Sequence, residues 1–323
     1  MAFRSPVSLG ILAIALVAGL SGCAQQGGGV PSASGACKYC DMRFKELSQR
    51  DMKRSDYAGA YLYGANFSWS YINQSSFKSA VLHQARFEWA DLDGANLTKA
   101  GGEGAVFHKA TLRRADLTMA SLDRANFRSA DLSGVNAVTT SLVRADLSDA
   151  NLVGGRFRQA NLGEAKLSAA RMENAEFQGA VLAQADLRGA RLSNTQFPDA
   201  VLDGADISNT ALDRIDFRKA SLRGANFEQA RLDRVDFAGA DLRDAKFQGA
   251  KFTNVSLAGA SLCGAVMPDG KAGTCTPAEL AAKARAAEPK PAPQPEPALM
   301  PAQPQRQSPA PTAEPQPEQP AQS

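Results

Sequence analysis

The sequence is poor in the residues that most often carry chemistry. Its 323 residues include two His, five Cys and two Trp, and aromatic residues make up only 7% of the chain. His83 and His108 lack the neighbouring Cys or paired carboxylates that metal sites and catalytic triads use. The 36 basic and 33 acidic residues give a net charge of +3, unlike the basic stripe of a nucleic-acid binder. The composition therefore disfavours an enzyme, a metal or cofactor site, a small-molecule substrate and a nucleic-acid partner.

A short apolar segment near the amino terminus ends at a Cys. Arg4 precedes an apolar run from Val7 to Leu20, which is short for a membrane span and typical of a signal peptide. Leu20-Ser21-Gly22-Cys23, at the end of this run, resembles the lipobox of bacterial lipoproteins. The resemblance implies a signal peptide over residues 1–22 and acyl chains such as palmitate on Cys23. The alternative is a plain secreted protein with an incidental Cys.

The residues after Cys23 refine this expected address. Ala24 follows the Cys, and without Asp at that position the resemblance to lipoproteins implies an anchor in the outer membrane of a Gram-negative bacterium, facing the periplasm. Residues 23–36 are rich in Gly and Ser and are expected to form a flexible tether.

Most of the chain follows a period of five residues. From Ala60 to Met267 there are 42 central positions, of which 23 are Leu, 13 Phe, two Ile and two Met. Two residues before the central position, 32 of the 42 residues are Ala. Residues two apart in an extended segment point to the same side, so the small and the large residue point inward while the others turn the chain. Repetition of this unit winds the chain into a solenoid whose coils hydrogen-bond to each other.

The exceptions to this rule give the length of one coil. Seven of the ten small positions that are not Ala are separated by multiples of 20, which indicates four pentapeptides per coil; they are Ser75, Val135, Gly155, Thr195, Ile215, Val235 and Val255. Among the large positions, only Gly102 and Ala137 break the rule. Ala137 accompanies the enlarged Val135, as a fixed interior volume requires. At Gly102, within the cluster Gly101–Gly104, we expect a weak coil with a bulge.

The units themselves resemble a known family. Ala90-Asp91-Leu92-Asp93-Gly94 and Ala130-Asp131-Leu132-Ser133-Gly134 match the A(D/N)LXX motif of the pentapeptide repeat family. This resemblance implies an all-β fold, a right-handed quadrilateral β-helix of about ten coils over residues 57–267. Some family members mimic DNA through an acidic, dimeric surface and act on topoisomerases. The 24 acidic and 24 basic residues between Ser55 and Met267 oppose that role here, while a homodimer stays open.

Both ends of such a solenoid need covers, because open strand edges invite further pairing. Residues 37–56 keep an apolar residue every five positions but place Lys45 and Arg50 in the small position, so they form either an N-terminal cap or a degenerate first coil. Residues 268–288 are expected to form a C-terminal cap turn and a short helix that starts near Thr276 and Pro277. Residues 289–323 include 12 Pro and are expected to form a disordered tail.

Four Cys remain for disulfides in an oxidising compartment once Cys23 is acylated. Cys263 and Cys275 flank the end of the last coil, and we expect a disulfide between them. Cys37 and Cys40 lie at the opposite end and form a lone C-x2-C pair. A local disulfide or two capping thiols are favoured over a redox or metal motif, which lacks its usual context here.

Two surface features stand out. Trp69 and Trp89 are 20 residues apart and should lie one above the other. With Tyr61, Tyr63 and Tyr71 they are expected to form a patch in the first coils that contacts a partner or the bilayer surface. The alternative is that the segment from Met42 to Tyr57 folds over this patch. A basic ladder is also expected, with Asp213 and Asp233 beside it to neutralise its charge; it consists of Arg171, Arg191, Arg231 and Lys251.

These features favour a non-enzymatic, lipid-anchored envelope protein that acts as a structural scaffold or protein-interaction surface. Its expected partners are the membrane, through the lipid on Cys23, and a protein whose identity the sequence does not give. The alternative function is a specific binding inhibitor or protective protein for one periplasmic target. No cofactor is expected in either case.

Overall fold

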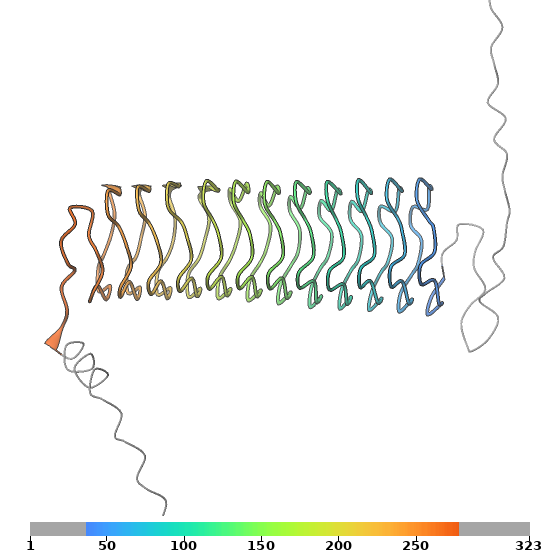
Figure 1. The fold of residues 1–323 in the computed structure, drawn as a ribbon, viewed down its shortest axis with the longest axis horizontal. Helices are drawn as coiled ribbons and strands as arrows, with labels where there is room; N and C mark the ends of the chain where they lie inside the picture. Colours follow the sequence, from blue (N-terminus) through green and yellow to red (C-terminus); the bar gives the residue numbers. More distant parts are fainter. Residues whose placement is uncertain (1–36, 278–323) are drawn as a thin grey trace, which may run out of the picture. The chain divides into compact units, whose positions relative to one another are not determined.

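The structure, a computed structural model, describes residues 37–277, which form a solenoid of stacked coils (Figure 1). Residues 20 apart pair in parallel, from Asp41 with Tyr61 to Lys246 with Val266, so each coil contains four pentapeptides. The signal peptide, the tether and the Pro-rich tail expected from the sequence lie outside the described residues. The expected all-β solenoid is confirmed.

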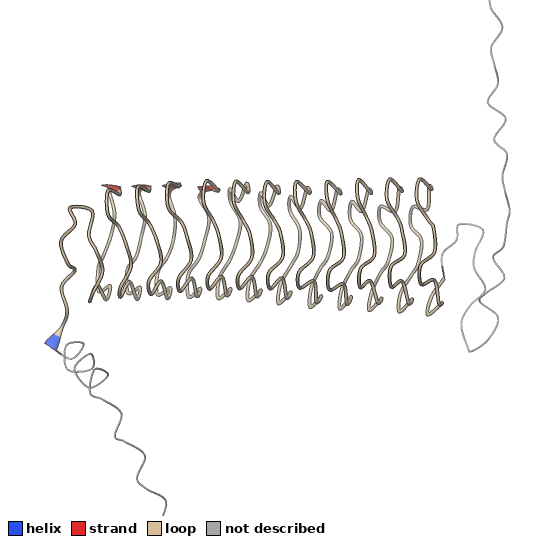
Figure 2. Ribbon diagram, viewed as in Figure 1, coloured by secondary structure: helices blue, strands red, loops and turns tan. Residues whose placement is uncertain are grey.

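Most of the pairing consists of single residues rather than long strands. The four named strands are β1 (Arg191–Ser193), β2 (Ala211–Asp213), β3 (Arg231–Asp233) and β4 (Lys251–Thr253), and they form one parallel sheet in that order (Figure 2). Each strand leads into a β-branched residue in the small position: Thr195, Ile215, Val235 and Val255. β-branched residues favour extended backbone, but they are not sufficient for a longer strand, because Val135 in the same column follows a single paired residue, Asp131.

A tight turn ends each pentapeptide. In the unit around Leu92, the N–H of Ala95 donates to the Leu92 carbonyl over 2.9 Å, and Gly94 between them has a φ of 64°. This matches a type II turn, in which the third residue adopts positive φ. Bulkier residues occupy the same turn position elsewhere, among them Trp69 and Trp89. Their strain is offset by the coils on both sides, which hold the backbone in place.

Backbone hydrogen bonds tie each pentapeptide to both neighbouring coils. The Leu92 N–H donates to the Thr111 carbonyl over 2.7 Å, and the Asp91 N–H donates to the Ser70 carbonyl over 2.9 Å. Repetition of this pattern satisfies the backbone without long strands. The coils are therefore fixed in spacing, and the interior volume per coil is nearly constant.

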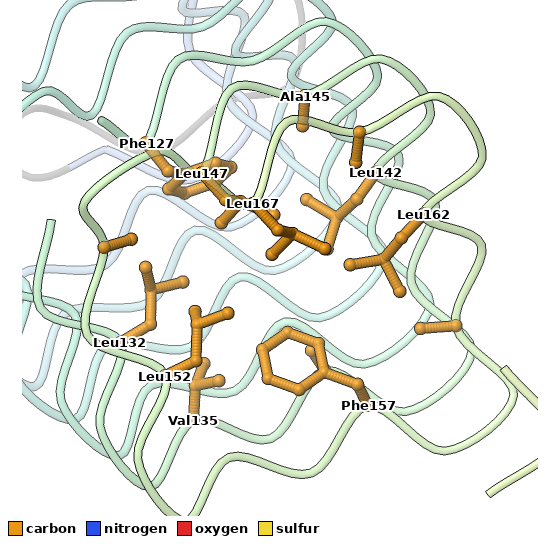
Figure 3. Close-up of a cluster of buried hydrophobic side chains, with 14 of the residues drawn as sticks. Phe127, Leu132, Val135, Leu142, Ala145, Leu147, Leu152, Phe157, Leu162 and Leu167 are labelled. Atoms are coloured by element: carbon orange, nitrogen blue, oxygen red, sulfur yellow. The ribbon is translucent and has the colours of Figure 1, made fainter. Parts of the chain in front are cut away.

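The interior is filled by one small and one large side chain per pentapeptide, nearly all fully buried. Phe67, Phe87, Phe107 and Phe127 stack with ring centroids 4.7–5.0 Å apart. A second stack from Phe157 to Phe237 has spacings of 4.9–5.2 Å. Phe127 and Phe157 enter the interior from opposite sides (Figure 3). The Phe stack moves to the opposite side between Phe127 and Phe157, where Val135 and Ala137 replace the usual small and large residues.

The expected bulge at Gly102 is wrong. Gly101 pairs in register with Val81 and Ser121, and the Gly102 N–H donates to the Ser121 carbonyl over 2.7 Å. A Cβ placed on Gly102 would lie 2.8 Å from Cδ2 of Leu122. The Leu side chain of the next coil therefore fills the space left by the missing one, and the backbone stays regular.

The two ends differ. Residues 41–56 continue the solenoid as a coil, with Met42, Leu47 and Met52 buried, while Lys45 and Arg50 are exposed. At the other end the chain turns back, because Ala272 pairs antiparallel with Val266 and a disulfide joins Cys263 to Cys275. Pro277 begins a helix at the last described residue, and the rest of that expected helix lies outside the described residues. Within residues 37–277, no helix is long and apolar enough to cross a membrane.

Candidate interaction surface

The residue before each large side chain points outward and has a structural task. The carboxylate of Asp91 accepts a hydrogen bond from the Asp93 N–H over 3.1 Å, and Asn96 does the same for the Thr98 N–H over 2.9 Å. Asp and Asn hold the start of a turn well because their short side chains reach the backbone two residues on. This explains the Asp or Asn of the repeat motif, and it shows that many surface carboxylates serve the fold.

Trp69 and Trp89 form the most distinctive pair on the surface. Their rings stack with centroids 4.8 Å apart and planes 8° apart, as the 20-residue spacing predicts. Lys109 continues the ladder, with its Nζ 4.3 Å from the centroid of the Trp89 ring. The two Trp residues remain 53% and 44% exposed. Because residues 42–57 form a coil, they do not fold over this pair.

The tyrosines expected in the same patch are spread around the solenoid. Tyr63 packs edge-on against Phe44, with centroids 5.3 Å apart, and its hydroxyl donates to Gln84. Tyr71 lies under the Nζ of Lys53, which is 5.3 Å from its ring. Tyr61 is exposed, and no ring contact joins any of these tyrosines to the Trp pair within residues 37–277. The single patch is therefore replaced by an exposed aromatic collar around the first coils: Tyr39, Phe44, Tyr61, Trp69, Tyr71 and Trp89.

Tyr39 and Phe44 are missing from the expected patch although the sequence carries their signal. Both lie at the turn position with positive φ that Trp69 also occupies. They are 67% and 70% exposed, the highest values among the large apolar side chains of residues 37–277. The five-residue period predicts both at exposed turn positions if residues 37–56 form a coil.

The basic ladder is present, but the expectation that Asp213 and Asp233 neutralise its charge is wrong. Arg191 pairs in register with Arg171, and β1, β3 and β4 carry Arg191, Arg231 and Lys251 along one sheet. Asp213 and Asp233 instead pair with the turn residues Arg214 and Arg234, each at 3.0 Å. Arg171 pairs with Glu173 at 3.7 Å.

The remaining candidates have structural partners. His83 Nδ1 accepts a hydrogen bond from the Glu103 N–H over 3.1 Å, and His108 Nδ1 lies 2.9 Å from the Arg128 carbonyl. Cys37 and Cys40 are buried and joined by a disulfide, with Cα atoms 5.5 Å apart. Among residues 37–277, no three His, Cys, Asp or Glu side chains gather into a group that could hold a metal ion.

A polar hollow of about 400 Å³ lies on the outer surface, with Arg158 and Pro198 among its lining residues. Its lining includes Asn174 and Asn194, whose amides hydrogen-bond each other over 2.8 Å. Ligand pockets are usually concave and mostly apolar. The amide-lined hollow lacks that apolar character.

Among the acidic residues near the C-terminal end of the solenoid, Asp241 has the most strongly shifted pKa. Nε of Arg243 donates to Oδ1 over 2.8 Å, and Nε of Arg223 donates to Oδ2 over 2.6 Å. These hydrogen bonds lower the pKa of Asp241 from 3.8 to about 2, with the Arg243 contact the largest cause and burial opposing it. Arg43 likewise lowers the pKa of Asp41 to about 2.

We expect Asp241→Asn to reduce stability near neutral pH but not in acid. Because the folded pKa lies below the unfolded one, the ion pairs stabilise the fold above about pH 4, and this stabilisation is lost as the pH falls through about 2. The half-exposed Arg223 is screened by water, which limits the effect to about 1 kcal/mol. The measurement is the free energy of urea unfolding for both proteins at several pH values across this range.

The outcome depends on the gap between the two unfolding free energies. The gap should close in acid, and a gap that is equal at both ends of the range would contradict the ion-pair account. Asp131→Asn is the control, since Asp131 accepts hydrogen bonds from Ser133 and Asn151 without an Arg or Lys partner among residues 37–277.

Comparison with known proteins extends these observations. A model for a pentapeptide repeat region matches residues 170–247. A second model, for pentapeptide repeats, matches residues 60–98, 103–136, 140–179 and 230–269. Together these matches cover residues 60–269 apart from two short gaps. No curated protein sequence matches the chain significantly.

Solved structures with similar repeats come from diverse sources. HetL, a pentapeptide repeat protein involved in heterocyst differentiation regulation in the cyanobacterium Nostoc, is 27% identical over 73% of this chain and 92% of its own, with a TM-score of 0.25. QnrB1, a plasmid-mediated fluoroquinolone resistance protein, is 22% identical over 58% of this chain and 91% of its own, with a TM-score of 0.45. A pentapeptide repeat protein of the Arabidopsis thaliana thylakoid lumen is 33% identical over 33% of this chain and 64% of its own, with a TM-score of 0.24.

Proposed function

Because the chain belongs to the pentapeptide repeat family, we propose that it is a non-enzymatic scaffold of the cell envelope, anchored by lipid on Cys23 in the outer membrane and facing the periplasm. In this proposal the solenoid is a right-handed, quadrilateral rod that presents its outward ladders to a protein partner. The anchor holds one end of the rod at the membrane.

The unbroken register from Asp41 to Val266 is the observation that carries this proposal. It uses the small and the large position of each unit for packing, and many of the outward Asp and Asn residues for turns. The turn positions and the rest of the outer surface are left for function. A surface of this kind suits recognition of a large partner along a rigid rod.

The lipid anchor and the compartment rest on the sequence and on the Cys residues. Leu20-Ser21-Gly22-Cys23 follows a short apolar run, and several acyl chains give stable anchoring where one chain does not. The two disulfides at opposite ends of the solenoid are consistent with an oxidising compartment.

Two measurements in intact cells test the proposal. A clickable fatty acid should label the protein, and Cys23→Ala should abolish both the label and its recovery in the outer-membrane fraction. Crosslinking followed by mass spectrometry should then recover several envelope proteins. Label that persists in Cys23→Ala would contradict the anchor, and a single stoichiometric partner would favour a specific inhibitor over a scaffold.

A further inference from the structure

Exposed apolar side chains are concentrated at one end of the solenoid. Six of the seven large exposed apolar residues within residues 37–277 belong to the aromatic collar, between Tyr39 and Trp89. The seventh, Met119, lies further along the solenoid. This distribution leaves the rest of the surface polar and gives the amino-terminal coils a different chemistry.

The collar surrounds the solenoid rather than marking one side. Each coil has four turns, and Tyr39, Phe44 and Trp69 occupy the positive-φ position of three different turns. Tyr61 and Tyr71 lie ten residues apart, on units separated by half a coil. A partner that docks on one side would meet only part of this set. A surface that receives the end of the rod would meet all of it.

Cations accompany the aromatic rings. Lys109 lies over Trp89 and Lys53 over Tyr71, while Lys45 and Arg50 are exposed in the first coil. Trp and Tyr combine an apolar ring with a polar group, and Lys and Arg pair an apolar stem with a charge that stays in water. Such residues gather at the boundary between lipid headgroups and acyl chains.

The chain length before the solenoid keeps the collar close to the proposed anchor. Thirteen residues lie between Cys23 and Cys37. Even fully extended, a chain of this length spans at most about 50 Å. The acyl chains would therefore hold the amino-terminal coils next to the bilayer, where even weak interfacial contacts are favoured by high local concentration.

We propose that the aromatic collar lies in the headgroup layer of the bilayer, so that the solenoid stands end-on with its amino-terminal coils at the membrane. This inference rests on the proposed lipid anchor. From Tyr39 to Trp89 the collar spans two and a half coils, or about 12 Å at strand spacing, which is comparable to one headgroup layer and its border. The anchor supplies attachment, and the collar supplies orientation.

The only two Trp residues belong to the collar, so Trp fluorescence reports on it directly. The full-length acylated protein is reconstituted into phosphatidylcholine and phosphatidylglycerol vesicles, with or without bromine on the acyl chains. The protein should float with the vesicles, and brominated lipid should quench its Trp emission. Flotation with unquenched emission would overturn the collar proposal alone. Failure to float would overturn the anchor and the collar proposal with it.

Variants with a single Trp test the end-on orientation. Trp89→Gln leaves Trp69, which is one coil nearer the membrane, and Trp69→Gln leaves Trp89. Gln suits this turn position, since Gln74 and Gln84 already occupy it with positive φ. Trp69 should be quenched more strongly than Trp89, whereas equal quenching would contradict the end-on arrangement and favour a rod that lies flat.

A matched control moves the reporter away from the collar. Met119 occupies the same turn position, with a φ of 59°, and is 56% exposed. A triple variant, Trp69→Gln, Trp89→Gln and Met119→Trp, therefore carries one exposed Trp beyond the collar. Its emission should not change with brominated lipid. Quenching equal to that of the collar Trp residues would show contact along the whole rod and overturn the proposal.

Discussion

Replacing Phe177 with Ala should lower the free energy of unfolding by about 3–5 kcal/mol. The Phe177 ring is fully buried and stacks between Phe157 and Phe197, with centroid distances of 4.9 and 5.1 Å. Hydrogen bonds to the coils on both sides hold the backbone at fixed spacing, so the walls cannot collapse into the cavity. Urea unfolding followed by circular dichroism measures the loss.

Phe177→Leu is the matched control for this variant. Leu97 and Leu117 stand in the same column, and Leu is the commonest residue at the large position. The smaller change in volume should cost about 1–2 kcal/mol, within the range of ordinary core substitutions. If Ala were tolerated as well as Leu, the interior would be less rigid than the inter-coil hydrogen bonds indicate.

The repeat made most of the fold predictable. The interior volume is nearly the same in every coil, so the five-residue period predicts which residues point inward. The spacing of Val135, Thr195 and the equivalent exceptions predicts the length of one coil. The state of residues 41–56 was not predictable in this way. Lys45 and Arg50 break the rule for the small position, yet in the first coil that position borders solvent and accepts an exposed charge.

Surface contacts were less predictable than the core, for a physical reason. The Trp69 and Trp89 stack follows from spacing, because rigid rings one coil apart have little choice of position. Ion pairs depend on the rotamers of long side chains, so Asp213 pairs with Arg214 in the adjacent turn rather than with the basic ladder. The period of 20 residues predicts which residues lie one above another on successive coils. Which of them form an ion pair depends on the length and rotamer of each side chain.

The difference in constraint between core and surface positions also bears on function. Core positions repeat with little freedom, so functional differences between such proteins must lie in the turns and the outward columns. The aromatic collar fits this division, since Trp69 and Trp89 occupy turn positions that Gln, Lys or Arg fill elsewhere. Substitution there should change membrane contact while leaving the fold intact.

Replacing Gly155 with Ala should destabilise the protein by about 1–3 kcal/mol, although Ala is the usual residue at this position. Gly155 has no positive φ, and at such a site a change to Ala commonly stabilises by about 0.4–1 kcal/mol. Here the new Cβ would lie 2.6 Å from the Phe157 ring, 3.0 Å from the Leu152 carbonyl oxygen and 3.3 Å from Val135. Stacking on Phe177 limits movement of the ring, so overpacking should exceed the entropic gain.

A double-mutant cycle identifies the cause. Gly155→Ala combined with Phe157→Leu restores the common pairing of Ala with Leu and removes the ring that the Cβ would meet. The combined loss of unfolding free energy should therefore be smaller than the sum of the two single losses, with a coupling of about 1–2 kcal/mol. Gly163→Ala is the control, because Gly163 also lacks positive φ and its Cβ would meet no atom closer than 3.3 Å. Additive losses in the cycle, or a gain in stability from Gly155→Ala alone, would show that the interior of this coil adjusts in volume, contrary to the constraint that links Val135, Ala137 and Gly155.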